Sequence, residues 1–270
     1  MIIIFLIIVL LIIILIAGKI NSSNQFSKQV NELFAQSKNI SEKTFRLDQI
    51  IDLPEPVQRY FKHVLKEGQS YVSYVRLTHD GEFKMGLDKK WTKIKGEQYF
   101  TTEKPGYIWK GTTSLATACD LYMSDKGRLI VTLLSLIKVV DGQGEVFDEG
   151  EFQRWVSESV WFPTNLLPSK KLHWLAIDEN TAKLIINYNE LSVSFLVSFN
   201  NKGEITQMET TRFMEKDKKE IWICKMADYK NMNGILIPTT AEALWKLDKG
   251  EFSYARFNVL KIEYNKPMRF

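Results

Sequence analysis

Three charged side chains near the middle of the chain, Glu151, Arg154 and Glu158, recur at helical spacing. Residues three and seven apart share one face of a helix, so the arginine is expected to lie between the two carboxylates. Two carboxylates could perform acid–base catalysis if burial separated their pKa values, whereas an arginine between them favours the ionised form of both. The spacing therefore favours a salt-bridged helix face over a catalytic dyad.

The sequence gives little support for other catalytic motifs. None of the three histidines has another His, Cys or Asp at metal-ligand spacing. The segment DGQGE at 141–145 lacks the third glycine and the lysine of a phosphate-binding loop, so a turn is predicted there. No serine occupies a G-x-S-x-G motif. We expect no cofactor and no metal, and we keep an envelope enzyme using Glu158, Arg154 or His79 as an alternative function.

Aromatic and polar side chains along the chain could line a pocket for an apolar ligand. Such pockets combine aromatic walls with a few oriented polar groups. The competing explanation is that a wide sheet needs large side chains to fill the space beneath a covering helix. An amphipathic ligand could place its polar end on Arg154 and its apolar body against Trp161. The candidate ligand-binding residues are Arg154, Glu158, Trp161, Thr164, Arg76, His79, Gln98, Tyr99, Trp109 and Tyr122.

Two amphipathic helices are predicted to position these residues. The first spans 52–68, with signals of a helix start at its proline-containing end. The second begins with Asp148, followed three residues later by Glu151 in a capping-box arrangement, and ends before Pro163. We expect the apolar stripe of the second helix to be buried, namely Phe152, Trp155, Val156 and Val160.

From residue 71 onward the hydrophobic period changes to two. Segment 191–199, LSVSFLVSF, alternates apolar residues with mainly serine, as a half-buried antiparallel strand does. Turn clusters such as HDGE and NNKGE separate similar runs. The predicted fold is α+β, mostly β, with a large antiparallel meander covered by one or two helices. Further strands are expected at 71–77, 82–86, 91–95, 97–102, 107–112, 119–124, 128–134, 183–188, 205–214, 221–228, 235–245 and 252–264.

The start of the chain predicts a membrane helix. Residues 1–17 contain no polar side chain, and the apolar run extends around Lys19 to roughly the 20 residues that span a bilayer. A secretory signal peptide would need a charged leading region and an A-x-A-like cleavage site, and the chain shows neither. We predict a transmembrane anchor at 1–20, a juxtamembrane linker or helix at 21–50 and an antiparallel β domain with helical cover at 51–270.

Charge and cysteine content limit which binding partners and which cellular compartment are expected. The formal net charge of +4 is dispersed without a basic block, which argues against nucleic acid. Lysines after the anchor favour a cytoplasmic body, but long domains are translocated largely regardless of charge. We predict a single-pass protein of the bacterial cytoplasmic membrane with an extracytoplasmic body. Cys119 and Cys224 permit one disulfide, and two buried thiols are equally consistent with the sequence.

A set of short sequence words points to one family. LPEPVQRYF, QYFTTEKPGYIW, DLYMSDKGRL, RWVSESVWFPTNLLP, GILIPT and GEFSYARFNVLKIEY occur in this order over roughly residues 52–264. The ordered set resembles an uncharacterised bacterial membrane-anchored family catalogued as a domain of unknown function (6544/6920 type), which implies no reaction. Asn165 and Asp125 stand where the family pattern has alanine and glycine.

The expected shape suggests a function by analogy. A continuous antiparallel sheet with a helix against one face is similar to the open half-barrels of bacterial lipoprotein carriers, which bind acyl chains on their concave side. We therefore predict a membrane-anchored cell-envelope protein that binds a lipid-like or other apolar ligand, or an envelope partner. The alternatives are the envelope enzyme named above and a structural or interaction module with a filled core. Fold alone does not decide between them.

Overall fold

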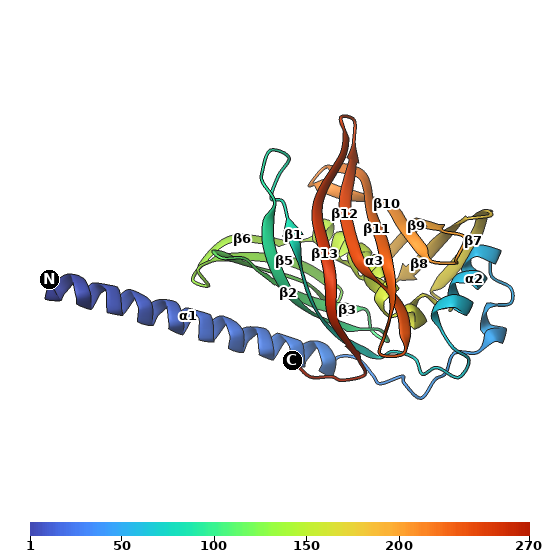
Figure 1. Ribbon diagram of the computed structural model, residues 1–270, viewed down its shortest axis with the longest axis horizontal. Helices are drawn as coiled ribbons and strands as arrows, with labels where there is room; N and C mark the ends of the chain where they lie inside the picture. Colours follow the sequence, from blue (N-terminus) through green and yellow to red (C-terminus); the bar gives the residue numbers. More distant parts are fainter.

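The computed structural model describes all of residues 1–270, a long N-terminal helix and a body built on one sheet (Figure 1). The helices are α1 (Ile2–Ala35), α2 (Glu55–Val64) and α3 (Glu145–Glu158), with short 3-10 helices η1 (Leu47–Ile50), η2 (Ser159–Trp161) and η3 (Pro163–Leu166). The first half of the sheet contains β1 (Tyr74–Phe83), β2 (Thr92–Thr101), β3 (Gly106–Thr112), β4 (Ala116–Met123), β5 (Lys126–Leu133) and β6 (Ile137–Gln143). The second half contains β7 (Leu172–Asp178), β8 (Thr181–Tyr188), β9 (Leu191–Phe199), β10 (Ile205–Glu215), β11 (Lys218–Met232), β12 (Ile235–Leu247) and β13 (Gly250–Tyr264).

The 13 strands form one antiparallel sheet in the order β6-β5-β4-β3-β2-β1-β13-β12-β11-β10-β9-β8-β7. Each half of the chain is a meander, and β1 pairs with β13, so β6 and β7 are the two edges. The sheet curls into an open half-barrel with helices beside it (Figure 1). The predicted fold, a large antiparallel meander with helical cover, is confirmed.

Some strand boundaries differ from the prediction. The expected turn HDGE lies inside β1, where Gly81 pairs with Phe257 of β13. A Cβ atom on Gly81 would lie 1.9 Å from the carbonyl oxygen of Arg256, so the glycine permits close strand approach. The edge strands β6 and β7 were not predicted. An edge strand buries few residues, so its sequence need not alternate between apolar and polar side chains. The first three residues of the expected turn at 141–145 belong to β6.

α3 carries the chain from one edge of the sheet to the other across the concave face. This path follows from the strand order, because β6 and β7 are consecutive in sequence but lie at opposite edges. The helix packs against β5, β4 and β10. The predicted apolar stripe is confirmed as buried, at Phe152, Trp155 and Val156 of α3 and at Val160 of the following η2.

The capping box predicted for this helix is wrong. α3 begins at Glu145, one residue after Gly144, whose φ of 110° suits glycine. Asp148 therefore lies in the first turn, where its carboxylate accepts hydrogen bonds from the backbone N–H of Gly127 and from Nζ of Lys126, both at 2.8 Å. The aspartate attaches the start of α3 to β5.

α1 is a single unbroken helix, so the first part of the juxtamembrane linker or helix predicted at 21–50 is helical as far as Ala35. Asn, Ser and Gln are tolerated within helices, and no proline or glycine interrupts residues 21–28. The first part of α1 is exposed, and by length and composition it could cross a membrane. The second part packs on the outer face of the sheet, where Phe26, Val30, Leu33 and Phe34 meet Tyr74, Tyr99, Ile108 and Leu121.

The concave face is filled over part of its length only. A core of 42 buried residues joins α2, α3 and the short 3-10 helices to the sheet. Toward the β1–β2, β5–β6 and β12–β13 turns, no helix covers the concave face (Figure 1). Inward-facing apolar side chains there remain partly exposed. We call this set the open inner surface; it comprises Phe83, Ala116, Ala118, Val131, Val140, Met214, Phe252 and Tyr254.

Candidate functional site

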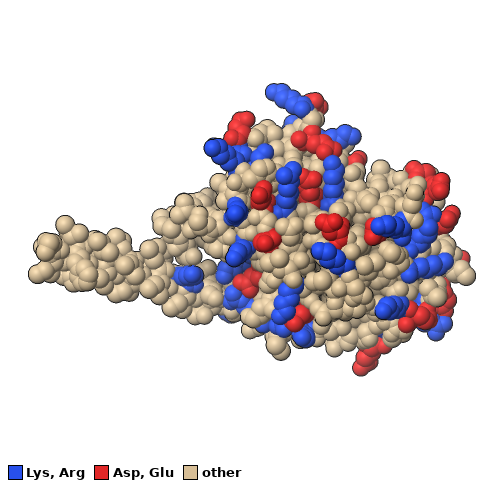
Figure 2. Space-filling model, viewed as in Figure 1, with Lys and Arg blue, Asp and Glu red and all other residues tan.

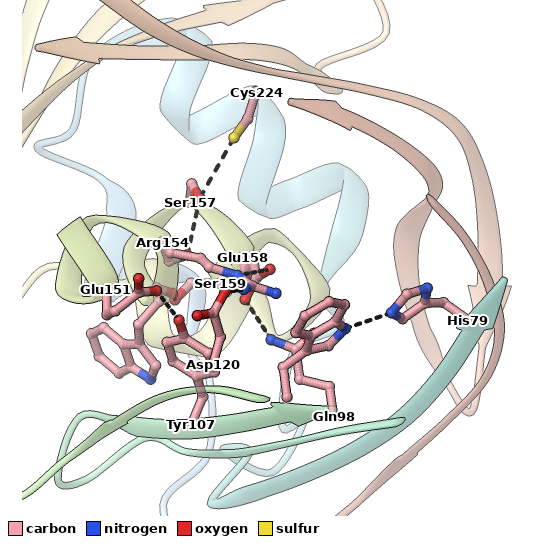
Figure 3. Close-up of polar contacts among 12 residues, drawn as sticks. His79, Gln98, Tyr107, Asp120, Glu151, Arg154, Ser157, Glu158, Ser159 and Cys224 are labelled. Atoms are coloured by element: carbon pink, nitrogen blue, oxygen red, sulfur yellow. Dashed lines mark hydrogen bonds and ion pairs between the residues drawn. The ribbon is translucent and has the colours of Figure 1, made fainter. Parts of the chain in front are cut away.

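A cluster of charged side chains lies between α3 and the sheet (Figure 3). Arg154 contacts Asp120 of β4 through Nη1 at 2.6 Å, and Glu158 through Nε at 2.9 Å. Each of these side chains is less than one-fifth exposed. Arg154 does lie between two carboxylates, but the one expected from Glu151 is supplied by Asp120.

Glu151 has other partners at the same level of the core. Its carboxylate accepts a hydrogen bond from the Tyr107 hydroxyl and lies 3.6 Å from Nη2 of Arg212. The guanidinium of Arg212 is 4.6 Å from the centre of the Trp222 ring. The cluster therefore joins α3 to strands from both halves of the sheet.

Asp120, Tyr107 and Arg212 were not predicted as site residues from the sequence. A signal for Asp120 was present, because strand alternation places it on the same face as Tyr122, which belongs to the core. A single aspartate on the inward face of an otherwise apolar strand needs a buried partner. Nothing local identified that partner, since Arg154 is 34 residues further along the chain.

The cluster contains three carboxyl groups and two guanidinium groups. Burial, reinforced by the nearby charge of Glu151, raises the pKa of Asp120 to about 7. Burial also raises the pKa of Glu158, against the opposing effect of Arg154. One of the carboxyl groups can thus hold a proton near neutral pH. Oδ1 of Asp120 is buried and has no hydrogen-bond partner.

Gln98, Trp109 and His79 extend the network along the inner face of β1 to β3. Nε2 of Gln98 donates to Glu158 at 2.7 Å, and the guanidinium of Arg154 lies 5.0 Å from the Trp109 ring centre. Nε1 of Trp109 donates to Nε2 of His79 at 2.7 Å. The imidazole lies over Gly96, where a Cβ atom would be 2.0 Å from His79 Nε2.

His79 is a neutral acceptor in this arrangement. Burial, with a smaller contribution from Arg154, lowers its pKa to about 4. Because Nε2 accepts from Trp109, the proton belongs on Nδ1, which faces the carbonyl oxygen of Asp80 at 3.3 Å. The lone pair that a general base would use is already engaged within the protein.

Arg76 and Tyr99, two of the candidate residues, lie on the opposite face of the sheet from the cluster. Arg76 pairs with Glu263 and donates to the carbonyl oxygens of residues 268 and 269. Tyr99 packs beneath Phe26 and Phe34 of α1. Arg76 thus attaches the C-terminal residues to the body, and Tyr99 attaches α1.

The remaining candidates make contacts within the core. Nε1 of Trp161 donates to the carbonyl oxygen of Pro238, and Oγ1 of Thr164 accepts from the backbone N–H of Val72. Tyr122 packs against Phe152, and its buried hydroxyl has no partner. Of the ten candidates, the structure joins Arg154, Glu158, Gln98, Trp109 and His79 into one network.

Two hollows lie outside this network. One of about 140 Å³ lies beside Trp155 and Tyr188, which is small for an organic ligand. The other, of about 710 Å³, has a largely polar lining that includes Asp80, Lys93 and Lys95. Neither has the apolar walls expected for a lipid-like ligand. Both cysteines are free thiols, so the disulfide that the sequence permitted is not formed.

Comparison with known proteins places the chain in a family but assigns no activity. A model described as a family of unknown function, DUF6920, matches residues 51–264, which confirms the predicted resemblance. The chain is similar to a LolA superfamily protein, NE2245, from Nitrosomonas europaea, at 9% identity and a TM-score of 0.44, covering 78% of this chain and 92% of that one. It is also similar to a putative outer membrane lipoprotein-sorting protein domain from Vibrio parahaemolyticus, at 9% identity and a TM-score of 0.42, covering 73% and 87%. A search of curated proteins found no match. Both structural likenesses are too distant to bear on function.

Replacing Arg154 with methionine should destabilise the fold strongly. The change keeps much of the volume but leaves Asp120 and Glu158 without their cation, and we expect the free energy of unfolding to fall by about 3–5 kcal/mol. Arg128→Met breaks a more exposed pair with Asp141 and should cost under about 1 kcal/mol. Chemical unfolding of the full chain in detergent, followed by tryptophan fluorescence, measures both. Equal costs would contradict the buried role of Arg154.

Asp120 should make stability fall as pH rises. Its pKa in the folded state, about 7, lies above its ordinary value of 3.8, so the folded state holds an additional proton between these values. The resulting stabilisation is complete below about pH 4 and is lost as pH rises through about 7. Asp120→Asn should flatten this slope. Asp141→Asn is the control, because Arg128 lowers the pKa of that carboxyl and it does not titrate in this range. An unchanged slope in Asp120→Asn would show that another group holds the proton.

Proposed function

The chain belongs to the family of unknown function DUF6920, and from its geometry we propose that it is a membrane-anchored cell-envelope protein that binds a lipid-like molecule on its open inner surface. The observation that carries the proposal is the uncovered apolar stretch of the concave face. α3 and the core fill one part of the half-barrel, while the open inner surface keeps its apolar side chains partly exposed. Apolar patches of this kind on folded proteins mark interaction sites.

The open inner surface has two different walls. On one wall Ala118 is directly opposite Val131, which is opposite Val140, so small aliphatic side chains are continuous across three strands. On the other wall Phe252 is paired with Trp245, and Tyr254 stacks against the same tryptophan. An aliphatic and an aromatic wall on the same concave face suit a long apolar chain, because burial is favourable along its whole length.

Charged groups border one end of this surface and select the ligand's polar end. Asp120 lies two residues from Ala118 on the same face of β4. The charge of Arg154 is already balanced by two carboxylates, so it offers little attraction to an anionic head group. The unpartnered Oδ1 of Asp120 favours a ligand hydroxyl, which can accept a hydrogen bond from the protonated carboxyl or donate one to the carboxylate. This differs from the direct role first expected for Arg154.

The enzyme alternative has weaker support in the geometry. His79 and Glu158 both have their acceptor atoms engaged by Trp109, Gln98 and Arg154. A substrate would have to displace these internal hydrogen bonds before either group could transfer a proton. A module with a filled core explains the part of the concave face beneath α3 but leaves the open inner surface without a role.

Photo-crosslinking can test where a lipid binds. The full chain in nanodiscs containing a phospholipid with a diazirine in its acyl chain should form adducts on Phe252 and Tyr254 after illumination. Val131→Glu places a charge on the open inner surface and should reduce these adducts at least about tenfold, since 1.4 kcal/mol suffices for that factor. Ile130→Glu changes the neighbouring residue, which faces the other side of β5, and should preserve them. Adducts confined to α1 would contradict binding on the inner surface.

Protease accessibility can test the proposed anchor and compartment. When the full chain is expressed in a bacterial host, α1 should retain it in membranes after a high-salt wash, because the apolar segment has the length of a span. External protease should digest the body in spheroplasts without lysis, leaving α1 in the membrane. Digestion only after lysis would place the body on the cytoplasmic side of the membrane and leave the anchor prediction intact. Release by salt would contradict the anchor itself.

A further inference from the structure

The β5–β6 turn exposes an unusually apolar surface. Between Leu133 and Val140, six apolar side chains are each at least 40% exposed. They stand on two strands at the sheet edge and on the turn between them, so they form one continuous projection. Leu115, in the neighbouring β3–β4 turn, is also exposed, at 64%. Exposed apolar surface of this extent needs an occupant.

The turn lies directly against the end of the apolar part of α1. A Cβ atom on Gly18 would be 2.3 Å from Cδ2 of Leu136 and 3.2 Å from the carbonyl oxygen of Ser135. Only the absence of a side chain at Gly18 permits this approach. The helix rises about 1.5 Å per residue, so Leu136 lies within one turn of Lys19, where the apolar run ends. Figure 1 shows the turn extending from the body beside α1.

The conformation of the turn adds an independent observation. Leu134 and Ser135 both have positive φ, at 52° and 59°. Hairpin turns of this type favour glycine, asparagine or aspartate, and Leu134 is the single large apolar residue with positive φ in this chain. A leucine here is unfavourable for the turn, and its side chain is 50% exposed at the tip. An apolar environment around the tip would offset that cost.

Charged side chains lie around this projection rather than on its tip. Lys19 follows the apolar run of α1, and Lys138 is on β6 beside Arg128 and Asp141. The lobe next to α1 is almost entirely uncharged on the face seen in Figure 2. Apolar residues bordered by basic ones are typical of surfaces that enter the interfacial layer of a bilayer, where lysine and arginine meet the head groups.

We propose that the β5–β6 turn is a second membrane-binding element, which inserts Leu134 and Leu136 into the interface of the bilayer spanned by α1. The proposal rests on α1 being the anchor, as stated under the proposed function. The continuity between the turn and the apolar helix identifies the occupant, because the two surfaces meet where the span ends. Val131 and Val140 continue this apolar strip into the open inner surface. Insertion would therefore direct that surface toward membrane lipid.

Depth-dependent fluorescence quenching tests the insertion. The full chain carries a single cysteine at Leu134→Cys or Leu136→Cys in a Cys119→Ala, Cys224→Ala background, labelled with the environment-sensitive fluorophore NBD. It is placed in nanodiscs of phosphatidylcholine and phosphatidylglycerol. A nitroxide near the top of the lipid acyl chain should quench both labels by about half or more, as expected for side chains at the acyl boundary. Leu175→Cys on β7, a leucine that is 50% exposed, should remain unquenched.

The outcomes separate this proposal from the proposed function. Retention in nanodiscs without quenching at either turn position would overturn insertion while leaving the anchor intact. A blue-shifted label that the nitroxide does not quench would show that protein covers the turn, which also overturns the proposal. Equal quenching at Leu175 would mean that the body lies flat on the membrane and that the turn has no special role. Loss of the chain from nanodiscs would contradict the anchor instead.

Discussion

The crossover from β6 to β7 is the constraint on which the rest of the structure depends. Two meanders joined at β1 and β13 leave consecutive strands at opposite edges, so one connection has to cross the concave face. α3 makes that crossing, and the contact of Arg154 with Asp120 fixes its position against the sheet. A buried ion pair adds little net stability compared with apolar packing, but losing one partner is costly. The pair is therefore best understood as setting the position of the helix.

The same crossing divides the concave face into two parts with different properties. Where α3 lies, aromatic side chains and the charged cluster leave little free volume. Beyond it, the strands continue with apolar side chains that no element covers. A chain that needed only a filled core would gain by shortening these strands or making them polar, since exposed apolar strand surface favours aggregation. The length of β11 to β13 beyond the helix is thus more consistent with binding than with folding alone.

Local periodicity made much of the fold predictable, and long-range pairing made much of the site unpredictable. Neighbouring residues alone predict the meander, the stripe of α3 and the apolar start of α1. They do not predict the second carboxylate beside Arg154, because helical spacing suggested Glu151, whereas the sheet brings Asp120 from 34 residues away. Arg76 and Tyr99 were expected in one site with the others because β1 and β2 are covered on both faces, by the core inside and by terminal segments outside. Burial on both faces removes the alternation that would have shown which way each side chain points.

The attachment of α1 fixes the orientation of the body relative to the apolar part of this helix, the candidate membrane span. Its second part packs on the outer face, and Arg269 near the C-terminus holds it by donating to Ser23 and Ser27 while pairing with Glu97. Because the helix is continuous from this contact to its exposed apolar part, the half-barrel cannot turn freely about the end of that apolar part as it would on a flexible linker. A fixed angle between the apolar part of α1 and the sheet is what allows a turn as far along the chain as Leu136 to meet the helix at Gly18. The outer face of the sheet thus sets the orientation, which leaves the inner face available for a ligand.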